Sequence, residues 1–210
     1  MTVAAGKSYD RAYFDRWYRH PAHRIGGAAD LERRVRMVIG VAEYLLARPV
    51  RTVLDVGCGE GRWRAPLRRA RPGVSYVGVD SSRYVVRRFG QSRGIRLGSL
   101  GTLSEVGLEA PFDLVVCADM LHYVPLAELR RGLDTLRALT GGVAYLEALT
   151  TSDGVGGDIR GFQRRTPATY RRLFREAGFV PCGPHLHAGP RVATQMAALE
   201  AVSGEPEAGD

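Results

Sequence analysis

A change of pattern near residue 50 constrains the fold more than any other feature of the sequence. Before it, apolar residues recur at spacings of three and four, which predicts one long amphipathic helix. Its apolar stripe comprises Leu31, Val35, Val38, Ile39, Ala42, Leu45 and Leu46. After it, short apolar runs alternate with longer amphipathic segments. Alternation of this kind predicts an α/β fold in which helices cover a doubly wound, mostly parallel sheet.

Several of the apolar runs are continuous, as expected for strands that are buried on both faces. The expected strands are Thr52–Val56, Ser75–Val79, Ile95–Leu97, Phe112–Cys117, Val143–Leu149, Phe179–Pro184 and Val192–Ala198. The expected helices between them are Gly61–Ala70, Ser82–Ser92, Pro125–Leu139 and Pro167–Ala177. The sheet is therefore expected to have seven strands.

The 210 residues of the chain fit a single domain that can bury a core without disulfides or metal. Residues 1–49 are interpreted as an N-terminal helical cap or lid of that domain, and residues 50–202 as its main body. Residues 203–210 are rich in Gly, Glu and Pro, which predicts a disordered tail.

The formal net charge of +8 says less about partners than its size suggests. Of the 30 basic residues only Lys7 is a lysine, and the chain has no Asn at all, a profile that codon bias in a GC-rich genome produces. Several arginines fall in helix-like runs, whereas a nucleic-acid protein concentrates them on one face. Nucleic acid is disfavoured as a partner, although it stays open as an alternative.

The cysteines and the hydropathy pattern point to a cytoplasmic protein. Cys58, Cys117 and Cys182 are widely spaced and odd in number, which disfavours a disulfide framework. No His, Cys or carboxylate set has the spacing of metal ligands, so no metal is expected. No apolar run approaches 18 residues, and no partnership with a membrane is expected.

The most specific motif is a glycine-rich turn between an expected strand and an expected helix. Its sequence runs Val53-Leu54-Asp55-Val56-Gly57-Cys58-Gly59-Glu60-Gly61. Glycines at these positions allow a sharp turn and the close approach of a ligand to the main chain. Asp55 precedes the first glycine by two residues, where its carboxylate can accept from a ligand ammonium group but would repel a pyrophosphate.

A second carboxylate, Asp80, ends the next expected strand, 21 residues after Gly59. A carboxylate at that place binds ribose hydroxyls in nucleotide-binding folds. The alternative is that Asp80 only caps the helix that begins near Ser82. The combination with Asp55 and the glycines favours a ribose-bearing ligand.

At these residues the chain resembles the class I S-adenosylmethionine-dependent methyltransferases of the small-molecule type. The resemblance covers roughly residues 50–200, and its first two motifs are LDVGCGEG and VGVDSS. It continues in FDLVVCADMLHY, which is similar to the fourth-strand motif of the family, and in FREAGF near residue 174. The resemblance implies a Rossmann-like methyltransferase fold, S-adenosyl-L-methionine as the cofactor, and cofactor binding by residues 50–202.

Carried over position by position, the resemblance implies a set of cofactor contacts. Gly57, Cys58 and Gly59 would pass close to the methionine part, with Asp55 near its amino group, and Asp80 with Ser81 would hold the ribose. Ser99 and Leu100 would lie around the adenine, although Ser99 departs from the Asp common in the family. The main chain near Cys117 would approach the methionine carboxylate or amino group.

Three residues are candidates for catalysis at the strand ends of the expected reaction face. His122 is interpreted either as a general base that removes a proton from the acceptor or as a packing residue. Asp119 and Glu147 lie where open α/β sheets place their ligands. Each of these carboxylates could bind or deprotonate the acceptor, or could be a cap or a surface group.

The aromatic residues of the N-terminal segment also allow two interpretations. Tyr13, Trp17 and Tyr18, together with Tyr9 and Phe14, could belong to the core. The resemblance implies the other possibility, a lid over cofactor and substrate that excludes water.

The resulting prediction is a monomeric or homodimeric cytoplasmic enzyme. It moves a methyl group from S-adenosylmethionine to O, N or C of a small molecule, possibly a secondary metabolite. Two alternatives stay open: a nucleic-acid (tRNA) methyltransferase, and a cofactor-binding protein of this fold that catalyses another reaction or none. The lack of Asn removes the Asn-containing motifs of other subclasses and disfavours magnesium dependence.

Overall fold

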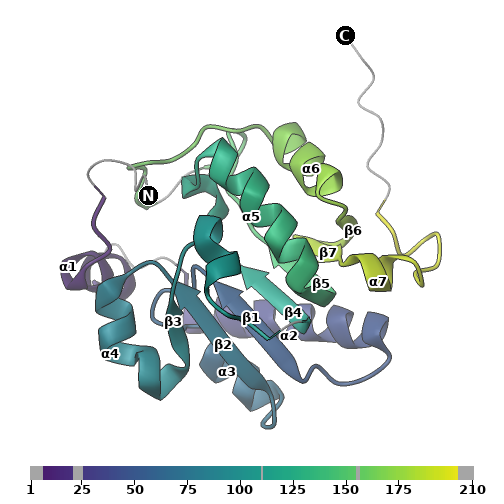
Figure 1. The fold of residues 1–210 in the computed structure, drawn as a ribbon, viewed down its shortest axis with the longest axis horizontal. Helices are drawn as coiled ribbons and strands as arrows, with labels where there is room; N and C mark the ends of the chain where they lie inside the picture. Colours follow the sequence, from purple (N-terminus) through teal and green to yellow (C-terminus); the bar gives the residue numbers. More distant parts are fainter. Residues whose placement is uncertain (1–6, 21–25, 110, 155–156, 203–210) are drawn as a thin grey trace.

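A twisted sheet forms the centre of the computed structural model, which describes residues 7–20, 26–109, 111–154 and 157–202 (Figure 1). Within these residues the sheet has seven strands in the order β3-β2-β1-β4-β5-β7-β6. They are β1 (Thr52–Val56), β2 (Ser75–Asp80), β3 (Ile95–Leu97), β4 (Phe112–Cys117), β5 (Thr140–Leu146), β6 (Val180–Gly183) and β7 (Leu186–Ala188). The expected disordered tail, residues 203–210, lies outside the described residues.

Strands β1 to β5 pair in parallel, and β7 pairs antiparallel with both β5 and β6. The chain order reverses between β1 and β4, so that the connections that leave the carboxyl ends of these parallel neighbours run in opposite directions along the sheet. A point of this kind is where open α/β sheets bind their ligands. The predicted doubly wound, mostly parallel sheet is confirmed.

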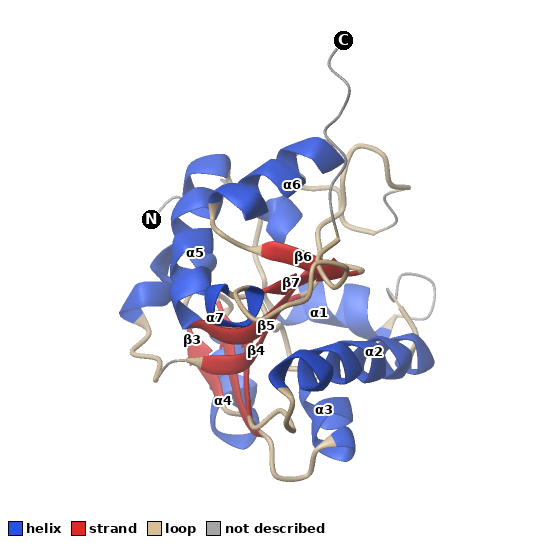
Figure 2. Cartoon of the chain, turned by 90° about the vertical axis from the view of Figure 1, so that its right-hand side faces the viewer, coloured by secondary structure: helices blue, strands red, loops and turns tan. Residues whose placement is uncertain are grey.

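The helices lie on both faces of the sheet (Figure 2). The α-helices are α1 (Arg11–Phe14), α2 (Ala28–Leu46), α3 (Arg64–Ala70), α4 (Arg83–Arg93), α5 (Leu126–Leu139), α6 (Pro167–Glu176) and α7 (Pro190–Ala193). A π-helical turn, η1 (Asp15–Arg19), continues α1, and 3-10 turns form η2 (Leu100–Glu105) and η3 (Leu121–Tyr123). None of these helices is long and apolar enough to cross a membrane, within the residues described.

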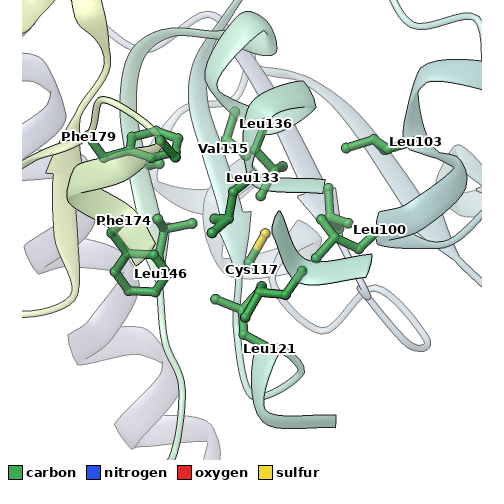
Figure 3. Close-up of a cluster of buried hydrophobic side chains, with 14 of the residues drawn as sticks. Leu100, Leu103, Val115, Cys117, Leu121, Leu133, Leu136, Leu146, Phe174 and Phe179 are labelled. Carbon is green, nitrogen blue, oxygen red and sulfur yellow. The ribbon is translucent and has the colours of Figure 1, made fainter. Parts of the chain in front are cut away.

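Alternate residues of the central strands supply two separate apolar cores. On β4, Val115 and Cys117 point to the face that is covered by η2, α5 and α6, and Leu114 and Val116 point to the face covered by α2 and α3. Figure 3 shows the first core, in which leucines of η2 and α5 meet side chains from β4, β5 and α6. Both faces of the strands are buried, which explains why their sequences are continuously apolar.

The structure corrects the sequence-based prediction at the C-terminal end. Val192–Ala198 is not a strand, because Pro190 begins α7, and proline is well accommodated in the first turn of a helix. The last strand is instead Leu186–Ala188, which follows β6 after a tight turn with His185 at φ 58°. The expected strand Val143–Leu149 is shifted as well, since β5 begins at Thr140 and ends at Leu146.

Candidate functional site

The glycine-rich turn lies at the carboxyl end of β1, directly before α3. Gly57, Gly59 and Gly61 have φ values of 68°, 52° and 73°, in the left-handed region that favours glycine. A Cβ atom on Gly57 would lie 2.7 Å from Cγ of Met120, and one on Gly59 would lie 2.5 Å from the Tyr18 hydroxyl. The turn therefore needs glycine for its backbone conformation and for the close approach of Met120 and Tyr18.

Asp80, at the end of β2, connects this turn to the start of α4. Its carboxylate accepts from the backbone N–H of Gly59 at 2.7 Å and from that of Ser82 at 2.8 Å. The N-cap of α4 is Ser82, whose hydroxyl accepts from Val85 N–H, so Asp80 is not the capping residue. Burial raises the pKa of Asp80, and its two backbone hydrogen bonds oppose that rise. A carboxylate has about four acceptor sites, which leaves Asp80 able to accept two further hydrogen bonds.

Asp55 is a nearly inaccessible carboxylate on β1, with 1% of the residue exposed. It accepts a hydrogen bond of 2.7 Å from the hydroxyl of Tyr76 on β2. Burial raises the pKa of Asp55 to about 7, while the Tyr76 hydrogen bond lowers it and the charge of Asp80 raises it further. A cation placed against Asp55 would relieve the cost of its burial.

The other residues expected near a cofactor differ in their exposure to solvent. Ser81 is exposed. The Ser99 hydroxyl lies 3.2 Å from the hydroxyl of Thr102 and 3.4 Å from Glu128 Oε1. Leu100 belongs to the core, where its side chain packs against Gly132 of α5. The Leu100 side chain is therefore directed away from solvent.

Both cysteines of the expected set are buried. Cys58 contacts the small apolar cluster that contains Phe14, Val85 and Ile95. Cys117 is fully inaccessible, and its carbonyl oxygen accepts from Glu147 N–H at 3.0 Å. Burial raises the pKa of both thiols, so neither has the properties of a reactive thiolate.

The N-terminal aromatic segment contacts both a small apolar cluster and the glycine turn. Phe14 is buried against α4, where its ring stacks on Tyr84 with 5.8 Å between centroids, and Figure 1 shows α1 beside α4. Tyr18 instead places its hydroxyl over Gly59, as described above. Tyr13 contacts Tyr9 and Phe14 edge to face, and Arg16 lies 5.0 Å from the ring of Trp17. The segment thus joins the core through Phe14 and covers the glycine turn through Tyr18.

Lys7 is a site residue that the sequence reasoning did not identify. Its ammonium group lies 3.0 Å from the Asp158 carboxylate and 3.5 Å from the centroid of the Tyr123 ring. The side chain is only 7% exposed, and burial lowers its pKa although Asp158 opposes this. Being the single lysine of an arginine-rich chain was the one signal in the sequence. Lys7 links the N-terminal segment to the loop that precedes α6.

His122 lies in η3, directly after β4, and is fully buried between aromatic rings. The ring centroids of Tyr123 and Phe162 are 4.2 and 5.3 Å away. Leu149 N–H donates to Nδ1 at 3.2 Å, which places the imidazole proton of the neutral ring on Nε2. Burial lowers the pKa of His122 to about 4, and the charges of Lys7 and Arg165 act in the same direction. A neutral imidazole in this tautomer has no free nitrogen lone pair, which favours the packing interpretation over the general base.

Asp119 and Glu147 lie after the ends of the neighbouring strands β4 and β5. Glu147 forms an ion pair of 2.9 Å with Arg34 of α2. Asp119 is a non-glycine residue with φ 57°, and its side chain is 47% exposed. Partial burial raises the pKa of Asp119 to about 6; Glu147 adds to the rise, whereas Arg34, Lys7 and Arg62 oppose it. The half-exposed Asp119 carboxylate, with its pKa raised to about 6, fits the requirements of a general base better than the inaccessible His122 imidazole does.

Two surface cavities are lined in part by the N-terminal segment. One, of about 360 Å³, is lined by Arg11, Asp15, Arg19, Tyr84, Arg88 and Phe89, between α1, η1 and α4. The other, of about 320 Å³, is lined by Tyr18, Gly26, Ala28, Leu31, Arg62, Ala65, Pro66 and Arg69. Tyr18 thus lies between the second cavity and the glycine turn. Among the described residues no group of His, Cys, Asp or Glu could hold a metal ion.

Comparisons with known proteins agree with this architecture. Residues 54–142 match the model of a methyltransferase domain, which includes the glycine turn, Asp80, Asp119 and His122. No curated protein matches the chain significantly.

Among solved structures, similarity extends over most of the chain at low identity. An O-methyltransferase family protein from Burkholderia thailandensis is 20% identical, with a TM-score of 0.55, over 78% of this chain and 58% of that one. Magnesium protoporphyrin IX methyltransferase from Synechocystis PCC 6803, solved with bound S-adenosylmethionine, is 20% identical, with a TM-score of 0.53, over 89% of this chain and 96% of that one. The [4+2]-cyclase SpnF is also 20% identical, with a TM-score of 0.54, over 79% of this chain and 62% of that one. The chain thus spans less than two thirds of some of these proteins, and at this identity the likeness establishes the fold alone.

Proposed function

We propose that the chain transfers a methyl group from S-adenosylmethionine to a small molecule, because residues 54–142 match the model of a methyltransferase domain and the fold is similar to that of solved methyltransferases. The observation that carries the proposal is the pair of buried carboxylates, Asp55 and Asp80, on either side of a turn made of left-handed glycines.

The donor set fits the chemistry of S-adenosylmethionine. Asp55 is a buried carboxylate with only the Tyr76 hydroxyl as a hydrogen-bond partner among the contacts described, and it would pair with the ammonium group of the methionine part. Asp80 has spare acceptor sites for the two ribose hydroxyls. The glycines would let the methionine part lie against the main chain, in the space that Tyr18 and Met120 now approach. Bound there, the cofactor supplies an electrophilic methyl group on a positively charged sulfur.

The remaining tasks fall to the protein. Positioning of the acceptor in line with the methyl group lowers the barrier to a displacement of this kind. The segment of residues 7–19 and the turn η3 lie together at the carboxyl edge, held by Lys7 against Asp158 and Tyr123. We propose that residues 7–19 and η3 together exclude water from the site and select a small acceptor.

Two alternatives have specific support. Arg11, Arg19 and Arg88 line the larger cavity beside Tyr84 and Phe89, an arrangement that could bind the phosphate and base of a nucleic acid. Asp15, however, lies 3.4 Å from Arg11 and 2.8 Å from Arg19 and balances part of this charge. The likeness to a cyclase favours the second alternative, a non-methylating reaction on the same fold.

A labelling experiment separates these possibilities. The purified chain is titrated with S-adenosylmethionine and then incubated with methyl-labelled cofactor, a small-metabolite extract, and in parallel total tRNA. The proposal expects binding, and label in a low-mass product. Failure to bind would contradict it, label in RNA would favour the nucleic-acid alternative, and binding without any labelled product would favour the non-methylating one.

A further inference from the structure

The starting point is a buried donor at the reaction face that has no acceptor. Nε2 of His122 lies within a side chain that is fully inaccessible, and no hydrogen-bond partner for it is found among the described residues. Because Leu149 N–H occupies Nδ1, Nε2 carries the proton and can only donate. Leaving such a donor unsatisfied costs about 1–3 kcal/mol. An acceptor placed next to Nε2 would remove this cost.

The Asp119 carboxylate is the best candidate for a hydrogen-bond acceptor of His122 Nε2. Its Oδ1 atom is 3.6 Å from His122 Nε2, just beyond hydrogen-bond distance, and the two residues are separated by one turn of chain. Asp119 also has φ 57°, a conformation that costs a non-glycine residue energy and persists where the surrounding structure imposes it. The left-handed residue keeps the carboxylate beside the buried N–H while leaving almost half of the side chain exposed.

Charged groups from several elements face Asp119. Glu147 at the end of β5 repels its negative form, and Lys7, Arg34 and Arg62 attract it. His122 cannot add a positive charge at neutral pH, because its own pKa is about 4. The imidazole therefore acts on Asp119 through the Nε2 proton alone.

We propose that Asp119 is the catalytic residue that accepts the hydrogen of the methyl acceptor, and that His122 is a positioning residue that donates to Asp119 from Nε2. The inference rests on the proposed function. In the transfer, the acceptor O or N forms a bond to the methyl carbon as the carbon–sulfur bond breaks. Sulfur keeps the electron pair, and the acceptor proton passes to the Asp119 carboxylate.

The role of Asp119 also defines the class of acceptor. A hydroxyl or an amine can donate a hydrogen bond and then a proton to the Asp119 carboxylate, whereas an ionised carboxylate acceptor has no proton to give. The acceptor is therefore a small molecule that presents an O–H or N–H group to the site.

The first test needs no acceptor and no turnover. In the isotope-labelled full chain, nitrogen shifts of His122 report the tautomer, and the carboxyl carbon of Asp119 is titrated from pH 4.5 to 8.5. The matched variants are His122→Gln, whose amide nitrogen approximates Nε2, and His122→Asn, whose amide approximates the Nδ1 position. We expect a neutral ring protonated at Nε2 and a wild-type titration midpoint that His122→Gln keeps. In His122→Asn we expect a midpoint about one unit higher, because the N–H group that lies beside the charged form of Asp119 is lost.

Equal midpoints in all three proteins, or a proton on Nδ1, would overturn the positioning role. If either His122 variant fails to fold, Asp119→Ala is used in its place. The Asp119 side chain is half-exposed, so its removal is expected to leave the fold intact. Loss of the Asp119 carboxylate must then shift the Nε2 proton resonance of His122, and an unchanged resonance would equally overturn the proposal. None of these readouts requires S-adenosylmethionine, so failure of the proposed function is recognised separately, by the lack of cofactor binding.

The second test uses the acceptor found by the labelling experiment. Single-turnover transfer should slow by about 10²–10⁴-fold in Asp119→Asn, with cofactor affinity retained. The wild-type rate should fall as the pH drops through the pKa of Asp119, and His122→Asn should move that fall to higher pH while His122→Gln leaves it in place. A rate in Asp119→Asn equal to that of the wild type would remove Asp119 from catalysis.

Discussion

At the scale of single residues, the buried carboxylates determine how the site responds to pH. Asp55 has a pKa of about 7 because it is buried, far above the usual value for an aspartate. Because of this raised pKa, Asp55 is protonated in the folded chain between about pH 4 and pH 7, whereas in the unfolded chain it is ionised in that range. The contribution of this proton to stability is complete below the unfolded pKa and is lost as the pH rises through about 7.

The same proton must leave before Asp55 can pair with a ligand ammonium group. We therefore predict that the dissociation constant of S-adenosylmethionine rises about tenfold from pH 8 to pH 6, since the carboxylate is increasingly protonated below 7. Calorimetry at both pH values measures this. Asp55→Asn, which can still accept from Tyr76, should bind more weakly and should lose most of the pH dependence. An equal pH dependence in the variant would assign it to another group.

At the scale of elements, the N-terminal segment is held at both of its ends. Phe14 and the ion pair between Arg19 and Glu60 fix α1 and η1 against α4 and the glycine turn. Lys7 fixes the start of the described segment, before α1, against Asp158 and Tyr123. The Tyr123 hydroxyl donates to the carbonyl oxygen of Asp158 at 2.6 Å. If the segment acts as a lid, one of these two attachments must open to admit ligands. The attachment at Lys7 does not involve the apolar core, so it is the one expected to open.

We predict that Lys7→Met increases the opening of residues 7–20 by about tenfold or more. The variant keeps the length of the side chain but loses an ion pair and a cation–π contact, which together contribute about 1–3 kcal/mol in a desolvated setting. Hydrogen exchange of the peptide that contains residues 7–20 measures the opening. Lys7→Arg keeps the charge and is the control, and exchange as slow in Lys7→Met as in the wild type would show that Lys7 does not fasten the segment.

The elements that the sequence predicted well are those with purely local signals. Strands β1, β3 and β4 match their predicted bounds, and β1 and β4 are mostly apolar runs. Pro66 falls in the first turn of α3, where a proline costs little. Val192–Ala198 was predicted wrongly because its apolar residues resemble a strand, whereas the antiparallel pairing of Leu186–Ala188 with β5 is a tertiary interaction.

At the scale of the whole molecule, the fold brings together residues that the sequence could not connect. The glycine turn, Asp55 and Asp80 were recognisable because one strand–turn–helix motif and one strand end define them. Lys7, Met120 and Tyr76 were not, since each reaches the site only through the packing of distant elements. The His122 tautomer was also out of reach, because the donor to Nδ1 comes from Leu149, which follows a different strand.

The central claim is that Asp80 and the glycine turn bind S-adenosylmethionine. The affinity of the Asp80→Ala variant for S-adenosylmethionine tests this claim most directly. Loss of two hydrogen bonds to a charged group, at about 1.5–3 kcal/mol each, should weaken binding by roughly a hundredfold or more. Asp134→Ala, on the exposed side of α5, is the control and should bind as the wild type does. Calorimetry measures the affinity of the three proteins, and circular dichroism confirms that each is folded. Wild type and Asp134→Ala should bind equally well, and Asp80→Ala should bind more weakly than both. Equal affinity of wild type and a folded Asp80→Ala variant would contradict the claim.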